Sequence, residues 1–73
     1  MEQELLELLK DALKTQRRKE SFESALGRTV RSHDKEFSVY VRMASEIRDF
    51  ACSRRQDMES AARTIVSESE KEA

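Results

Sequence analysis

Apolar residues recur at alternating steps of three and four along residues 37–65. This spacing keeps one face of an α-helix turned toward a partner helix, as in a coiled coil. Eight of the nine positions are apolar, and Arg54 is the exception. We therefore predict a single helix over about residues 34–67. Its packed face would contain Phe37, Tyr40, Ala44, Ile47, Ala51, Arg54, Met58, Ala61 and Ile65.

A second helical pattern covers residues 2–16 and is rich in leucine. Its leucines form an arc that is broader than one neighbouring helix can cover. The surplus either lies inside a three- or four-helix arrangement or contacts another protein. The leucines in question are Leu5, Leu6, Leu8, Leu9 and Leu13.

The stretch 14–21 contains no apolar residue and includes the basic run Arg17-Arg18-Lys19. Because no glycine or proline marks a stop, we expect the first helix to continue, with at most a bend near 17–21. A break is the alternative, in which case Ser21 would cap a new helix.

Residues 32–35 offer two N-cap candidates, so the chain is expected to turn near His33. Two helices would then form an antiparallel hairpin whose register brings Gly27 level with Tyr40. This gives one all-α, coiled-coil-like domain over residues 1–67. Residues 68–73 lack an apolar anchor and are expected to fray as an acidic tail.

Composition supports helices, because Ala, Glu, Lys, Leu and Arg supply 38 of 73 residues, with one glycine and no proline. A chain this short buries a small core, and its single cysteine excludes an internal disulfide. We therefore expect a homodimer or heterocomplex that completes a helical bundle. Disorder of the isolated chain is the competing interpretation, since 40% of residues are charged. Folding on dimerisation would reconcile the two.

Residues suited to catalysis are scarce: there is one histidine, no Glu-x-x-His pair and one glycine. Acid–base sites, di-iron centres and glycine-rich phosphate loops each need more. We expect no enzymatic activity, cofactor or metal. No targeting signal or membrane span is visible, and with the unpaired cysteine this favours a cytoplasmic or nuclear location.

Charge is distributed unevenly along the chain. Residues 1–16 carry −2, residues 17–35 carry +3, residues 36–57 carry zero and residues 58–73 carry −2. A hairpin would place both acidic ends opposite a basic turn, which would attract an anion. The pI near 5.8 and the lack of interleaved aromatic residues make nucleic acid the second choice of partner. The anion-binding candidates are Arg28, Arg31, Lys35 and Arg42.

The sequence thus predicts a small non-enzymatic protein-interaction module, such as an adaptor, chaperone-like binder or regulatory subunit. It would dock helices of its own kind or of another protein, and Arg54 would set specificity by pairing with Asp11 or Glu7. A nucleic-acid-binding or transcription-regulatory dimer is the alternative, and a segment of a longer coiled coil is a third interpretation. The predicted interface residues are Leu5, Leu6, Leu8, Leu9, Leu13, Ile47, Arg54, Met58 and Ile65.

Overall fold

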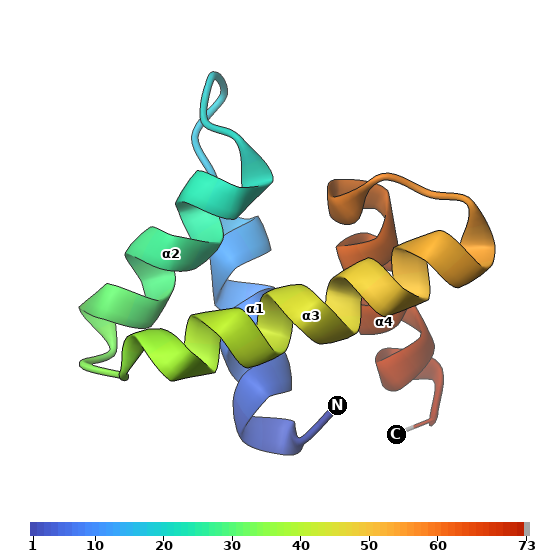
Figure 1. The fold of residues 1–73 in the computed structure, drawn as a ribbon, viewed down its shortest axis with the longest axis horizontal. Coiled ribbons are helices and arrows are strands. Elements are labelled where there is room, and N and C mark those ends of the chain that lie inside the picture. Colours follow the sequence, from blue (N-terminus) through green and yellow to red (C-terminus); the bar gives the residue numbers. More distant parts are fainter. Residues whose placement is uncertain (73) are drawn as a thin grey trace.

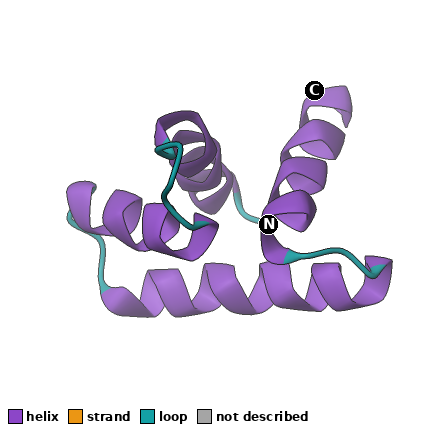
Figure 2. Cartoon of the chain, turned by 90° about the horizontal axis from the view of Figure 1, so that it is seen from above, coloured by secondary structure: helices purple, strands orange, loops and turns teal. Residues whose placement is uncertain are grey.

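The computed structural model describes the backbone of residues 1–72 and the side chains of residues 1–71. In this part of the chain there are four α-helices, joined by short loops, and no strand (Figures 1 and 2). The all-α prediction is confirmed, but four helices stand where two were expected. They are α1 (Gln3–Thr15), α2 (Phe22–Ser32), α3 (Phe37–Arg54) and α4 (Met58–Glu72).

The single helix predicted over residues 34–67 is wrong, because the chain breaks between α3 and α4. Arg55 adopts the left-handed conformation, with φ 54° and ψ 44°. The Gln56 amide then donates to the carbonyl oxygen of Ala51 at 2.9 Å, which closes the helix end. Asp57 starts the next helix by accepting a 2.7 Å hydrogen bond from the Ser60 amide. The chain therefore breaks here without glycine or proline. Arg55 ends α3, and Asp57 caps the start of α4.

The first helical pattern also ends earlier than expected, at Thr15. The Glu20 amide donates to the carbonyl oxygen of Arg17 at 3.1 Å and makes a turn. The Ser24 amide donates to Ser21 Oγ at 3.2 Å, so Ser21 caps α2. The alternative of a break near 17–21 is the correct one.

The turn predicted near His33 joins α2 to α3. Asp34 has φ 56°, and the Lys35 amide donates to the carbonyl oxygen of Val30 at 3.1 Å. A Cβ atom on Gly27 would lie 3.8 Å from the ring of Tyr40, so the predicted pairing of these two residues is confirmed.

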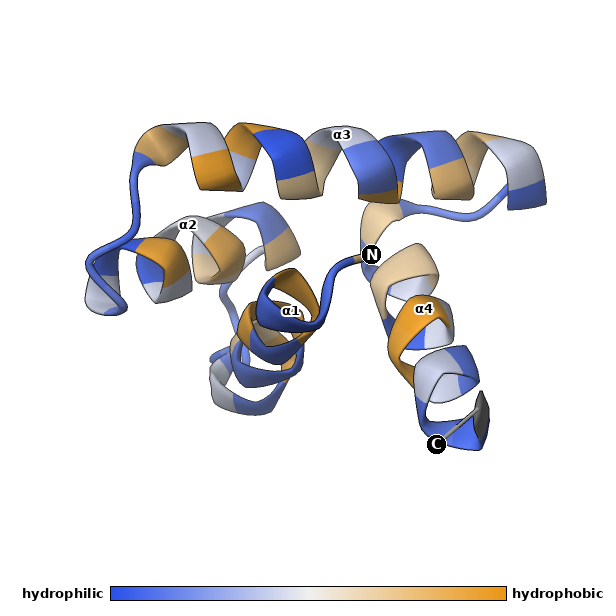
Figure 3. Cartoon of the chain, turned by 90° about the horizontal axis from the view of Figure 1, so that it is seen from below, coloured by the Kyte–Doolittle hydropathy of each residue, from blue (hydrophilic) through white to orange (hydrophobic). Residues whose placement is uncertain are grey.

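The core lies between α3 and the pair of helices α1 and α2, which pack side by side beneath it (Figure 3). Helix α4 closes the remaining side of the core. The Cα radius of gyration is 11.4 Å, which is about the 11 Å expected of one folded domain of this length. The leucine surplus of α1 is buried within one chain because α2 and α4 both contact this helix. The main cluster of buried core residues consists of Leu5, Leu8, Leu9, Ala12, Phe22, Leu26, Val30, Met43, Ile47, Ala51, Ala61 and Ala62.

Among the described residues, the C-terminal helix has the fewest fully buried side chains of the four helices. Its fully buried apolar residues are Ala61 and Ala62, while Ile65 and Val66 are half-buried. Residues 68–72 of the expected tail belong to α4, and Ala73 lies outside the described residues.

Candidate functional site

The leucines predicted to bind a partner are mostly in the core. Leu5, Leu6, Leu8, Leu9 and Ile47 are at most 5% exposed. Within this structure they are not a free surface, and they would reach a partner only if helices separated. The half-buried members of the predicted interface are Leu13, Met58 and Ile65.

Arg54 lies at the end of α3 and is exposed rather than packed between helices. Its guanidinium is 3.2 Å from a Glu68 carboxylate oxygen of α4 and 4.6 Å from the centre of the Phe50 ring. The expected pairing with Asp11 or Glu7 does not form, because α3 ends here and the side chain meets α4. Asp11 instead pairs with His33 at 2.9 Å.

The four cations predicted to attract an anion do not form one site. Arg28 pairs with Glu20, Lys35 with Glu4 and Arg42 with Glu2. The acidic start of α1 lies beside the α2–α3 turn, so carboxylates of the same chain neutralise this region. Lys35 lowers the pKa of Glu4 chiefly through their hydrogen bond, and Glu2 in the same way raises the pKa of Arg42. Arg31 is the member for which the described residues include no ion pair.

A groove that is open to solvent lies between α2 and α3, and we call it the aromatic groove. It encloses about 490 Å³. Gly27 leaves room for the Tyr40 ring, and Phe37 forms the outer wall. The lining residues are Glu23, Ser24, Gly27, Val30, Arg31, Lys35, Phe37 and Tyr40.

This aromatic groove is unusual for the exposure of its apolar side chains. Phe37 is 74% exposed, and Val41, which lies one turn further along α3 and outside the groove lining, is 50% exposed. The Phe37 and Tyr40 rings stack with their centres 5.5 Å apart. Rings held in this way need little further ordering when a partner binds.

A second groove, which we call the basic groove, lies between α1 and α4 and encloses about 470 Å³. Half-buried Leu13 and Val66 supply its apolar lining. Three cations and one carboxylate provide its charged lining. These side chains are Lys10, Lys14, Arg63 and Glu70, together with Ser67.

A smaller hollow of about 310 Å³ lies where the start of α1 meets α3 and α4. Leu6, Phe50 and Ile65 give it an apolar lining, and Glu46 and Glu68 make it acidic. Leu6 and Ile65 thus come together, although Leu6 is only 5% exposed.

Groups suited to catalysis are not gathered in the described residues. His33 and Asp11 form a half-exposed pair, with no serine, threonine or cysteine bonded to the imidazole. No cluster of three or more side chains suited to a metal occurs in residues 1–71. Cys52 is exposed and unbonded there.

The sequence predicted Leu13 as an interface residue and Arg31 and Lys35 as anion-binding residues, but it did not predict the two grooves that these residues line. Phe37 and Tyr40 were assigned to a packed face because their spacing continues that of Ala44 and Ile47. Lys10 and Lys14 are four residues apart on one helical face, which indicates a basic stripe on α1 but not the groove that α4 completes.

Comparison of the chain with protein-family models, curated proteins and solved structures finds no match. Among the described residues, no helix combines the length and apolar character needed to cross a lipid bilayer.

Proposed function

We propose that this chain is a protein-interaction module that binds an amphipathic α-helix of a partner protein in the aromatic groove. The observation that carries the proposal is the Phe37 ring, which is 74% exposed at the wall of that groove. Aromatic side chains are frequent anchors of protein interfaces because they bury a large area at little conformational cost.

The groove suits a helix better than a small polar ligand. Phe37 and Tyr40 present apolar surface, and Gly27 lets the Tyr40 ring pack closely against α2. An amphipathic helix fills such a groove with residues spaced three and four apart.

Charge at the two ends of the groove favours one direction for that helix. Glu23 lies in the first turn of α2 and Arg31 in its last turn, and both are exposed without a described ion pair. An α-helix is positive at its N-terminus and negative at its C-terminus. The bound helix would therefore place its N-terminus near Glu23 and its C-terminus near Arg31.

A displayed library of amphipathic helical peptides, selected on the intact chain, tests this function. Binders should lose about tenfold or more in affinity on Phe37→Ala, because an aromatic anchor is removed. Their affinity should change little with salt, because apolar contacts dominate.

Arg48→Ala is the matched control, since Arg48 is also exposed on α3 but does not line the groove. Binders that tolerate Phe37→Ala, or a selection that yields none, would refute the proposal. Self-association of the chain through Phe37 would also refute the proposal, because the groove would then be occupied by a second copy of the chain.

Nucleic-acid binding is the second candidate, and one observation favours it. Arg17, Arg18 and Lys19 form the exposed loop between α1 and α2, and the described residues give them no side-chain ion pair. Contacts between these cations and phosphates would weaken steeply as salt rises, unlike binding in the aromatic groove.

A further inference from the structure

We infer that the basic groove is a second docking site and that its occupant is an acidic amphipathic helix of a partner protein. The α1–α4 surface carries both kinds of contact that such a helix needs. Leu13 and Val66 would receive its apolar face, and cations at the edges would receive its carboxylates.

The charge on the groove is predominantly positive. Lys14 is exposed, and the described residues include no ion pair for it. Lys10 is 4.0 Å from Glu7, and Arg63 is 3.6 Å from Glu59, so both pairs are longer than a hydrogen bond. Exposed pairs of this length contribute little, and both cations remain able to turn toward a partner carboxylate.

The apolar lining favours a peptide over a nucleic acid. A phosphate backbone has no apolar face to cover Leu13 and Val66, whereas an acidic amphipathic helix covers them and pairs with the cations at once. Val66 is half-buried in the groove, so part of its side chain remains available to such a helix.

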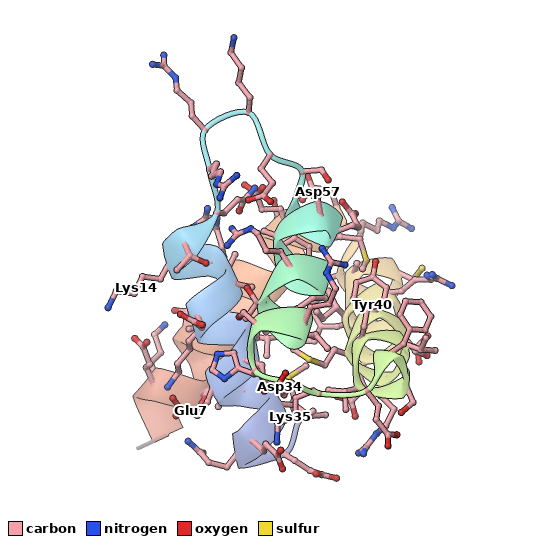
Figure 4. All side chains as sticks on the ribbon, turned by 90° about the vertical axis from the view of Figure 1, so that its left-hand side faces the viewer. Glu7, Lys14, Asp34, Lys35, Tyr40 and Asp57 are labelled. Carbon is pink, nitrogen blue, oxygen red and sulfur yellow. The ribbon has the colours of Figure 1, made fainter. Side chains whose placement is uncertain are left out.

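The two grooves are independent surfaces. They share no lining residue. Lys14 of the basic groove and Tyr40 of the aromatic groove point away from opposite sides of the molecule (Figure 4). An occupant of one groove therefore leaves the other free.

Two synthetic peptides test the inference, each with leucines on one helical face and either glutamates or lysines on the other. Fluorescence anisotropy should show the glutamate peptide binding at least tenfold more tightly than the lysine peptide. Lys14→Glu should weaken the glutamate peptide about fivefold or more, because an attractive contact becomes repulsive.

Lys19→Glu makes the same charge change in the neighbouring loop and should leave this affinity nearly unchanged. All of these affinities are measured in the Phe37→Ala background, which removes the anchor of the aromatic groove, so failure here is distinguishable from failure at the aromatic groove. Circular dichroism must show that each variant stays helical.

Three results would overturn the inference. The lysine peptide binding equally well would remove the role of charge. Equal losses in Lys14→Glu and Lys19→Glu would indicate only general attraction. A DNA oligonucleotide that binds and depends on Lys14, while the glutamate peptide does not bind, would assign the groove to nucleic acid.

Discussion

The carboxylate of Glu20 is the centre of the contacts that hold the α1–α2 loop. Arg28 donates to both of its oxygens, at 2.8 and 3.0 Å, and also to the carbonyl oxygen of Thr15 at 3.0 Å. The Arg17 amide donates to the same carboxylate at 3.1 Å. A two-pronged pair of this kind fixes geometry as well as charge. It ties the end of α1 to the middle of α2.

These hydrogen bonds lower the pKa of Glu20 from 4.5 to about 2, with the Arg28 contact as the main cause. A carboxyl group whose pKa is lower in the folded state stabilises the fold above its unfolded pKa. That contribution is lost as the pH falls from about 4.5 through 2.

Glu20→Gln should therefore lower the melting temperature at pH 7 by roughly a few degrees. The difference from wild type should shrink as the pH falls from about 4.5 through 2, because Glu20 is protonated in both states only below its folded-state pKa. Circular dichroism melts across this range measure the effect.

Glu46→Gln is the control, since Glu46 is an exposed carboxylate for which the described residues include no ion pair. A difference between Glu20→Gln and wild type that stays constant down to pH 2 would show that the hydrogen bonds do not act through ionisation.

Among the helices, the break between α3 and α4 occurs at Arg55. Its left-handed conformation is costly for a residue with a side chain and is usually adopted by glycine. Tertiary packing overrides this local preference, because the break lets Ala61 and Ala62 turn back onto the core.

Arg55→Gly should stabilise the fold by about 0.5–1 kcal/mol, because glycine adopts this conformation without steric cost. The melting temperature should rise by a few degrees for a domain of this size. Thermal or urea denaturation followed by circular dichroism measures the change.

Arg48→Gly provides the contrast, since Arg48 is exposed in the middle of α3 and the same substitution there should destabilise the helix by about 1 kcal/mol. If both variants lose stability equally, the left-handed conformation of Arg55 is not the cost that we assign to it.

The sequence predicted the helix boundaries at which a capping or turn residue is present. Ser21 was identified as a possible cap, and residues 32–35 as a turn. The break at 55–57 was missed because Arg55 resembles an ordinary helical residue and the apolar spacing continues across it. Asp57, three residues before Ser60, was the available signal for a new helix start.

The sequence also identified the apolar residues of the molecule as a whole but misjudged where they would be buried. A two-helix hairpin leaves leucines uncovered, whereas four helices surround Leu5 and Leu9 within one chain. The grooves could not be predicted, because they depend on how α4 packs against α1 and on how α2 packs against α3. Periodicity along a helix does not specify either.

Because the core is closed within one chain, we predict a monomer of 8.5 kDa at micromolar concentration. Light scattering coupled to size-exclusion chromatography, over a tenfold range of concentration, measures the mass. The homodimer expected from chain length depends on uncovered leucines, which this fold does not leave. A stable dimer that persists on dilution would contradict the prediction.

The two grooves lie on opposite sides of the molecule. A partner polypeptide that carries both docking segments therefore needs a linker of sufficient length between them. The molecule measures 29 × 27 × 20 Å along its principal axes. A flexible linker spans about 5–6 Å times the square root of its residue number, so roughly 25 residues cover a straight 27 Å, and a path around the surface needs more. Partners with longer linkers would wrap a single copy, whereas those with much shorter ones would bridge successive copies into an alternating polymer.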